Sequence, residues 1–298
     1  MALRVTPSMM HLQMTRNIYN NLSRMDDRQL QLSTGKKLNK PSDNPVGITY
    51  SLRYRSDLSI NDQFQKNADT AKSWLDYTDT VLNQVNDIVQ RANELTVQAV
   101  NGTNPQEAMN AVNVEMGQIY DQIISLSNSQ MNSKYIFNGQ LTDIMPYDKS
   151  NADKQTTDTA GIEYRFAEGA GLSINVTGMD VFGNPSDADN LFGVLQRLQD
   201  SLKAGNQDSA RGELNQLKSR LAKINEVRSE VGAKTNRIDL ISERLGNLEM
   251  NLTEMQAKVE DADMAETIMK LKQDESVYQA SLATGARIVQ TSLLDYLR

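Results

Sequence analysis

The chain has 298 residues, of which 39% are hydrophobic, with one Trp, five Phe and a formal net charge of −7. So few bulky core residues in a chain of this length favour long, thin helical bundles over one thick core. The chain holds no cysteine and one histidine, His11, which excludes disulfides and thiolate chemistry and argues against Ser-His-Asp catalysis and multi-histidine metal sites.

The sequence predicts neither a membrane-spanning segment nor a secretion signal. The start, Met1–Pro7, lacks the apolar core of a signal peptide. No apolar stretch approaches the length needed to cross a bilayer. We therefore expect no membrane partner, and any export is expected to proceed without a cleavable signal peptide.

An amphipathic helix is predicted from the N-terminus to about Leu38. Its apolar residues step by three and four, which places them on a narrow stripe that is best buried against another helix. The segment ends in a Pro-rich stretch, where Pro41 and Pro45 disfavour helix in the residues before them. Asn44 and Pro45 fit the cap and first position of a new helix. We interpret Pro41, Asn44 and Pro45 as a candidate hinge.

The most regular stripe of the chain predicts a long second helix, followed by a third. The second stripe runs without a slip through Phe64, Ala68, Ala71, Leu75, Thr78, Leu82, Val85, Val89, Ala92, Thr96 and Ala99. A glycine stop and a capping-box-like restart at Asn104–Glu107 separate it from the third helix. The third stripe consists of Met109, Val112, Met116, Ile119, Ile123 and Leu126.

A short β-prone region interrupts the helices. Tyr135–Phe137 is a β-prone run closed by Asn138-Gly139. Apolar residues then alternate with polar ones over 162–166 and 172–176, across the turn-forming Glu168–Gly171. This alternation predicts a hairpin. Residues 140–189 are thus expected to form a small β-rich insert, too small to hold a robust core by itself.

Helical spacing returns after the insert and continues to the C-terminus. One helix is predicted over Leu191–Leu202, another from Leu214 that continues through Val259, and a last one near the C-terminus. Neither terminal stripe has a neighbour in sequence to cover it, so we expect the ends to pair with each other or with other subunits. We name the two terminal stripes together the terminal seam: Ile18, Leu22, Met25, Leu32, Ile268, Leu271, Tyr278, Leu282, Val289 and Leu293.

The predicted fold class is mainly α with a small β-rich insert, in which the N- and C-terminal halves form a discontinuous helical bundle or coiled coil. We predict three domains. Residues 1–42 and 256–298 form a terminal helical assembly domain, residues 43–139 and 190–255 a helical bundle, and residues 140–189 the outer β domain.

No constellation of residues predicts catalysis, a cofactor or a metal site. Asp261–Glu266 is acidic but lacks the turn glycine and spacing of a calcium-binding loop, which favours a solvated helix start. Gly169–Gly171 lies in a hairpin and is not followed by a helix, so a phosphate-binding loop is not predicted. The basic N-terminal segment has no interleaved aromatic residue beyond Tyr19, and no nucleic-acid partner is expected.

Four motifs in the same order resemble the bacterial flagellin superfamily. They are Leu30–Asn39, Arg91–Thr103, Asn236–Ile238 and Glu260–Ala265. Three further segments resemble the hook-associated branch, the hook–filament junction proteins, more than the filament subunit. These are Lys40–Val46, Tyr135–Gly139 with Pro146-Tyr147, and Ala283–Leu297.

The resemblance implies a structural adaptor of the bacterial flagellum, located outside the cell at the hook–filament junction. It implies export through the flagellar type III apparatus and assembly into a ring of copies. The implied partners are the hook-side junction protein, flagellin and a cytoplasmic export chaperone. The alternatives are flagellin itself with a reduced outer domain, or a soluble enzyme or regulator with a coiled-coil arm.

Three residues lie at positions that resemble the flagellin surface recognised by a vertebrate Toll-like receptor: Arg91, Leu95 and Glu115. Arg91 and Leu95 are four apart and miss the stripe of the second helix, so both are expected to face outward or to be partly covered. The alternative, which we favour, is that this face contacts a neighbouring subunit.

Overall fold

The computed structural model describes residues 7–100 and 106–296. The chain forms two compact units, each described separately below. The terminal unit contains residues 1–60 and 248–298, and the central unit contains residues 61–247. The terminal unit is therefore discontinuous, as the nested order of the elements predicts. The three-domain division, with its own borders, stays a prediction.

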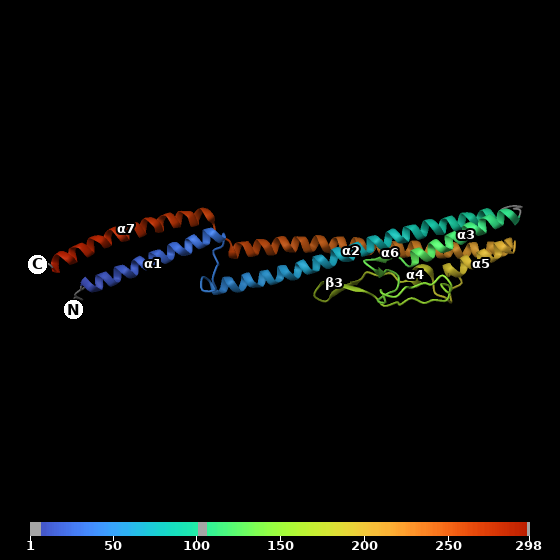
Figure 1. The fold of residues 1–298 in the computed structure, drawn as a ribbon, viewed down its shortest axis with the longest axis horizontal. Coiled ribbons are helices and arrows are strands. Elements are labelled where there is room, and N and C mark those ends of the chain that lie inside the picture. Colours follow the sequence, from blue (N-terminus) through green and yellow to red (C-terminus); the bar gives the residue numbers. More distant parts are fainter. Residues whose placement is uncertain (1–6, 101–105, 297–298) are drawn as a thin grey trace. The chain divides into compact units, whose positions relative to one another are not determined.

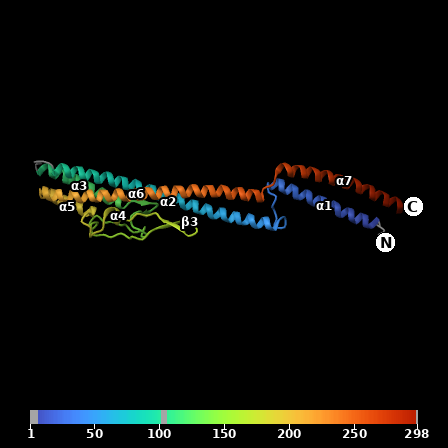
Figure 2. The ribbon, with the colours of Figure 1, turned by 180° about the vertical axis from the view of Figure 1, so that it is seen from behind.

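Two antiparallel helices, α1 (Pro7–Thr34) and α7 (Met264–Tyr296), lie side by side in the terminal unit, with the start of α1 beside the end of α7 (Figures 1 and 2). The ends therefore pair with each other, one of the two expected arrangements, and pairing with other subunits stays a prediction. The predicted end of the first helix near Leu38 is wrong by four residues. Gly35 adopts a φ of +70°, which L-residues avoid, and this conformation ends the helix.

Two long helices run through both units: α2 (Pro45–Val100) and α6 (Gln207–Glu260). Asn44 caps α2 as predicted, because its Oδ1 accepts a hydrogen bond from the backbone N–H of Gly47 at 2.9 Å. The predicted stripe of α2 is buried from Ala68 to Ala99, whereas Phe64 at its start is half-buried. An ion pair between Lys72 and Asp239 ties α2 to α6 in this stretch.

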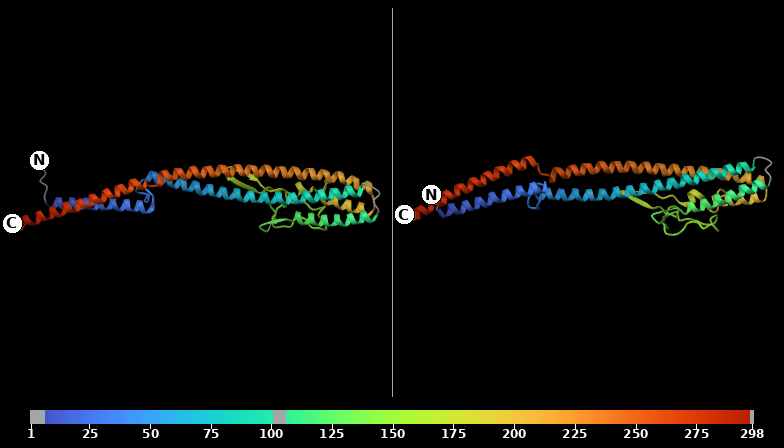
Figure 3. Two further views of the ribbon diagram at one scale, coloured as in Figure 1. Left: turned by 90° about the horizontal axis from the view of Figure 1, so that it is seen from above. Right: turned by 45° about the horizontal axis from the view of Figure 1, so that its top comes forward.

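The central unit is completed by α3 (Gln106–Ser127) and α5 (Leu191–Lys203), which lie beside the two long helices (Figure 3). The predicted stripe of α3 is buried except for Leu126, which is half-buried. The four leucines of α5 are all buried: Leu191, Leu195, Leu198 and Leu202.

The insert lies along these helices and shares their core. The β1–β2 hairpin (Gln130–Met131 and Lys134–Tyr135) precedes it, and within it β3 (Glu163–Ala167) pairs with β4 (Ala170–Ser173). Tyr164 lies opposite Leu172, which confirms the predicted hairpin. The remainder of the insert is turns, loops and the short helix α4 (Gly178–Phe182). Helices dominate the other described residues, which confirms the predicted fold class, mainly α with a small β insert.

Two details of the β prediction need correction. Only Tyr135 of the predicted run Tyr135–Phe137 belongs to a strand, because Ile136 and Phe137 turn into the core. The second hairpin strand ends at Ser173, although Ile174 and Val176 are buried as the alternation requires.

Aromatic side chains join the insert to the helices. The Phe182 ring of α4 lies 5.3 Å from Phe137 and 5.4 Å from Phe192 of α5, measured between centroids. Tyr147 packs 4.8 Å from Phe192, and its burial raises the pKa of its hydroxyl strongly. The insert and the bundle therefore form one continuous core in the central unit rather than two.

A buried charge cluster fixes α6 to the loop before α5. The Arg220 guanidinium is almost fully buried and donates to Asp189 Oδ1 at 2.7 Å and to the Asp189 backbone oxygen at 2.9 Å. Lys223 Nζ lies 2.9 Å from Asp189 Oδ2. Burial raises the pKa of Asp189, but the hydrogen bond from Lys223 and the charge of Arg220 outweigh it and leave this pKa below its ordinary value. Asp189 is thus held as a paired anion.

Candidate assembly surface

The contact between α1 and α7 has a polar centre around Asn21. The Asn21 amide donates to Ser281 Oγ at 2.8 Å, and Arg24 donates to Asn21 Oδ1 at 2.6 Å. Arg24 also lies 3.5 Å from the carboxylate of Asp274. Asn21 is the most buried side chain described in α1. A polar centre of this kind fixes the register of a helix pair and contributes less stability than an apolar one.

Close packing occurs where Met14 of α1 meets Gly285 of α7. A Cβ atom at Gly285 would overlap the terminal methyl group of Met14, so no other residue fits there without a shift. Met14 thus packs directly over Gly285, and a larger residue there would require the flexible Met14 side chain to move.

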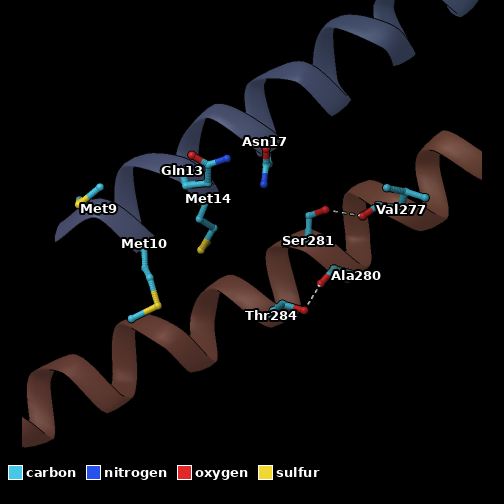
Figure 4. Close-up of a pocket in the computed structure, with 9 residues that line it drawn as sticks. All are labelled: Met9, Met10, Gln13, Met14, Asn17, Val277, Ala280, Ser281 and Thr284. Carbon is cyan, nitrogen blue, oxygen red and sulfur yellow. Dashed lines mark hydrogen bonds between the residues drawn. The ribbon is translucent and has the colours of Figure 1, made fainter. Parts of the chain in front are cut away.

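A groove of about 690 Å³ lies between the same two helices (Figure 4). Met9, Met10 and Met14 form much of its α1 wall. On the α7 wall, the hydroxyls of Ser281 and Thr284 donate to backbone oxygens of their own helix, at 2.7 and 2.9 Å. These hydroxyls are already hydrogen-bonded, and the groove therefore offers a mainly apolar and flexible surface.

The helix pair covers only part of the terminal seam. Half-buried seam residues are Ile18, Met25, Leu32, Leu271 and Tyr278. Leu22, Ile268 and Leu282 expose 40%, 48% and 44% of their surface. Val289 and Leu293 lie outside the residues whose side chains the structure describes. A row of exposed large apolar residues is typical of a surface that binds another protein. The role of the seam in assembly stays a prediction.

Sequence reasoning missed a buried carboxylate at the end of α6. Glu260 is nearly inaccessible, and Arg55 of α2 binds it through two hydrogen bonds of 2.8 Å. Lys36 Nζ lies 2.6 Å from the same carboxylate, which also accepts hydrogen bonds from Ser51 and Gln256. The hydrogen bonds from Arg55 lower the pKa of Glu260 furthest, and the other donors add to the effect.

Backbone hydrogen bonds join the two connecting segments beside Glu260. Lys37 N–H donates to the Glu260 oxygen at 2.7 Å, and Ala262 N–H donates to the Gly35 oxygen at 3.0 Å. The segment that follows α1 (residues 35–44) and the segment that precedes α7 (residues 261–263) are therefore held together by backbone hydrogen bonds.

The predicted hinge lies in the first of these segments and is held by hydrogen bonds. Asp43 Oδ2 accepts from the backbone N–H groups of Asn39 and Lys40, at 2.9 and 2.8 Å, and these bonds lower the pKa of Asp43. Pro41 lies in the turn that they close, and Asn44 and Pro45 begin α2. The geometry describes a well-ordered connection, and motion at Pro41, Asn44 and Pro45 stays a prediction.

The receptor-like surface needs a correction. Leu95 exposes only 2% of its surface, so the expectation that it faces outward or is partly covered is wrong. The ion pair between Arg91 and Glu115 places α3 beside α2 in this stretch, and this second helix widens the buried face of α2 beyond one stripe. Arg91 is exposed and Glu115 is half-buried, and the two form an ion pair of 2.8 Å between α2 and α3. A receptor contact at Arg91 and Glu115 stays a prediction.

The described residues contain no group of three or more His, Cys, Asp or Glu side chains that could hold a metal ion. His11 is an exposed residue of α1. Across the ranges that the structure describes, every helix is too short or too polar to cross a membrane.

Two sequence families match the chain. The bacterial flagellin N-terminal helical region matches residues 5–142, and the bacterial flagellin C-terminal helical region matches residues 214–297. The chain is 25% identical to flagellin from Halalkalibacterium halodurans over 95% of both proteins. It is 24% identical to flagellar hook-associated protein 3 from Escherichia coli (strain K12) over 94% of this chain and 95% of that protein.

The fold is also found among solved structures. The crystal structure of flagellar hook-associated protein-3 from Legionella pneumophila superposes with a TM-score of 0.62 at 14% identity, covering 69% of this chain and 98% of that chain. All four motifs quoted from the sequence lie within the two matched regions.

Proposed function

Since the chain belongs to the bacterial flagellin superfamily, we propose that it is a structural adaptor subunit that joins the flagellar hook to the filament. The observation that carries this proposal is the terminal helix pair, which leaves Leu22, Ile268 and Leu282 uncovered. Exposure of such residues to water is unfavourable. Covering them with a second helix stabilises the assembly by about 25 cal/mol per Å² of apolar surface removed from water. A chain with this surface at both ends is suited to assembly with other subunits.

The first alternative is that the chain is flagellin itself. Relatives at similar identity include both a flagellin and hook-associated protein 3. The junction role is favoured because hook-associated protein-3 shares the fold at a TM-score above 0.6, and because segments such as Lys40–Val46 resemble the junction branch. Copy number separates the two roles, since filament subunits greatly outnumber junction subunits.

The partners follow from the same role. The adaptor forms a ring with other copies of itself, with the hook-side junction protein on one face and flagellin on the other. It passes through the flagellar type III apparatus and functions outside the cell. Before export, a cytoplasmic chaperone covers the C-terminal segment, because an exposed apolar stripe on an unassembled chain is an aggregation hazard. Deleting residues 256–298 should abolish chaperone binding in a pull-down; unchanged binding would contradict this assignment.

Gene deletion tests the proposed function. In a strain that lacks this gene, flagellin should appear in the medium as monomer while hooks remain without filaments. Restoring the gene on a plasmid should return filaments to the hooks. If the deletion strain secreted no flagellin, this chain would be the filament subunit itself, and the alternative role as flagellin would hold. Normal filaments in the deletion strain would rule out both roles.

A further inference from the structure

One loop of the insert exposes three large apolar side chains. Leu141, Ile144 and Met145 expose 51%, 58% and 49% of their surface within a five-residue segment, Leu141–Met145, which we call the insert loop. The loop belongs to the central unit, away from the terminal seam in sequence. Contiguous exposed apolar residues on a soluble protein mark a site of interaction.

The insert loop is held in one conformation. The Asn138 side chain is buried and donates to the backbone oxygens of Leu141 and Ile144, at 3.1 and 3.0 Å. Tyr135 N–H donates to the Thr142 oxygen at 2.8 Å. A loop fixed in this way loses little conformational entropy when it binds. Its apolar side chains are therefore presented ready for contact.

A second exposed surface lies on α6. Leu240 exposes 68% of its surface. Arg237 and Arg244, three residues before it and four after it, lie along one side of Leu240, and the exposed Glu243 lies on its other side. Ile238 and Leu245 are buried, which places this α6 strip (Arg237, Leu240 and Arg244) away from the core. Within the described residues, neither arginine of the strip has an ion-pair partner in its own chain.

The two surfaces are complementary in charge. Asp143 is exposed at the centre of the insert loop and has no ion-pair partner among the described residues. Beside the loop, Asp158 accepts the backbone N–H of Gln140 at 2.8 Å, which lowers the pKa of Asp158 and keeps it ionised. Lys134 and Glu163 line the adjoining groove with one charge of each sign. An apolar loop with acidic groups thus matches an apolar position that carries two arginines along one side.

We propose that the insert loop of one copy of this chain binds the α6 strip of the next copy. The proposal rests on the proposed function and names a lateral contact of the ring. The two surfaces are different patches on the same chain, so the contact is head-to-tail and can continue from copy to copy. Leu141, Ile144 and Met145 would cover Leu240, while Asp143 would pair with Arg237 or Arg244.

Cysteine cross-linking tests this contact directly, because the chain has no cysteine of its own. A strain that lacks the gene would express two variants together, Ile144→Cys and Leu240→Cys, and its isolated flagella would be treated with a mild oxidant. A disulfide forms only where Cα atoms approach within about 7 Å. We expect a covalent dimer from the mixture and none from either variant alone. The matched control replaces Leu240→Cys with Val114→Cys, an equally exposed position on α3 at 67%.

Charge reversal supplies a second measurement. Asp143→Arg should lower the dimer yield about tenfold through like-charge repulsion, and adding Arg237→Asp and Arg244→Asp to the Leu240→Cys partner should restore it. Filaments without the I144C–L240C dimer would overturn the contact while leaving the adaptor role intact. A dimer from Ile144→Cys alone, or equal yield with Val114→Cys, would also overturn it. Loss of filaments on gene deletion is scored separately and tests the adaptor role itself.

Discussion

In the central unit the helical stripes are covered within one chain, whereas in the terminal unit they are covered only in part. Ala71, Leu75 and Leu82 of α2 are completely buried by the other elements of the central unit. In α1 and α7 the seam residues whose side chains the structure describes are half-buried or exposed, and the centre of the helix pair is polar. The same spacing of apolar residues therefore gives a self-sufficient core in one unit and an incomplete one in the other. The difference teaches that an apolar stripe predicts a buried helix face, but does not indicate whether the same chain or another subunit buries it.

The largest effect is expected from a charge placed on the uncovered seam. Leu22→Asp or Leu282→Asp should abolish assembly and leave the central unit folded, because a carboxylate buried in a helix interface costs several kcal/mol. Motility of a complemented deletion strain reports assembly, and far-UV circular dichroism of the purified protein reports folding. Ser276→Asp, at an exposed position on another face of α7, is the control and should keep motility. Wild-type motility with either seam variant would show that the seam is not an assembly surface.

The buried charge cluster should matter most to the stability of the central unit. Asp189→Ala removes the carboxylate that binds the buried Arg220 guanidinium at 2.7 Å and leaves only Asp187, 3.7 Å away, which should destabilise the fold by about 3–5 kcal/mol. The control is Asp208→Ala, at an exposed position in the first turn of α6, the helix that carries Arg220. This substitution should change the free energy of unfolding by less than about 0.5 kcal/mol. Urea denaturation curves measure both. Equal curves for the two variants would contradict the assigned role of the cluster.

One substitution made in both units tests the comparison itself. Leu75→Ala removes a fully buried side chain and should cost about 2–5 kcal/mol in the free energy of unfolding. Leu282→Ala removes a partly exposed one and should leave the unfolding of the monomer nearly unchanged while weakening assembly. The same urea curves, recorded on dilute monomer, check the first result. A comparable loss of stability from Leu282→Ala would mean that the terminal unit is already fully packed.

The smallest effect concerns Glu260. Because its folded pKa lies below the ordinary value of 4.5, its ion pairs contribute stability above that pH, and this contribution is lost as the pH falls below it. Glu260→Gln should destabilise the terminal unit by about 2 kcal/mol at neutral pH, since it removes charge-assisted hydrogen bonds to Arg55 and Lys36. The variant should also flatten the acid dependence of unfolding. If the free energy of unfolding of the variant depended on acid pH in the same way as that of the wild type, this account would be contradicted.

The helical stripes and the hairpin could be predicted because they follow from the spacing of residues close together in sequence. The partner of Glu260 could not, because Arg55 lies 205 residues away and periodicity carries no information on such pairs. Arg220 and Asp189 were missed for the same reason, at a separation of 31 residues. Leu95 was predicted to be at least partly exposed because the single apolar stripe of α2 describes contact with one neighbouring helix. α2 has more than one neighbour at this position, and Leu95 faces another of them.

Amide hydrogen exchange on dilute monomer and on assembled flagella tests the central claim, that the terminal helices complete their packing only in the assembly. Isolated helices are marginal, and most of their stability comes from tertiary contacts. In the monomer we expect fast exchange through α1 and α7 and slow exchange along the buried stripe of α2 from Ala68 to Ala99. In assembled flagella α1 and α7 should become as slow as α2. Slow exchange throughout α1 and α7 of a verified monomer would contradict the claim.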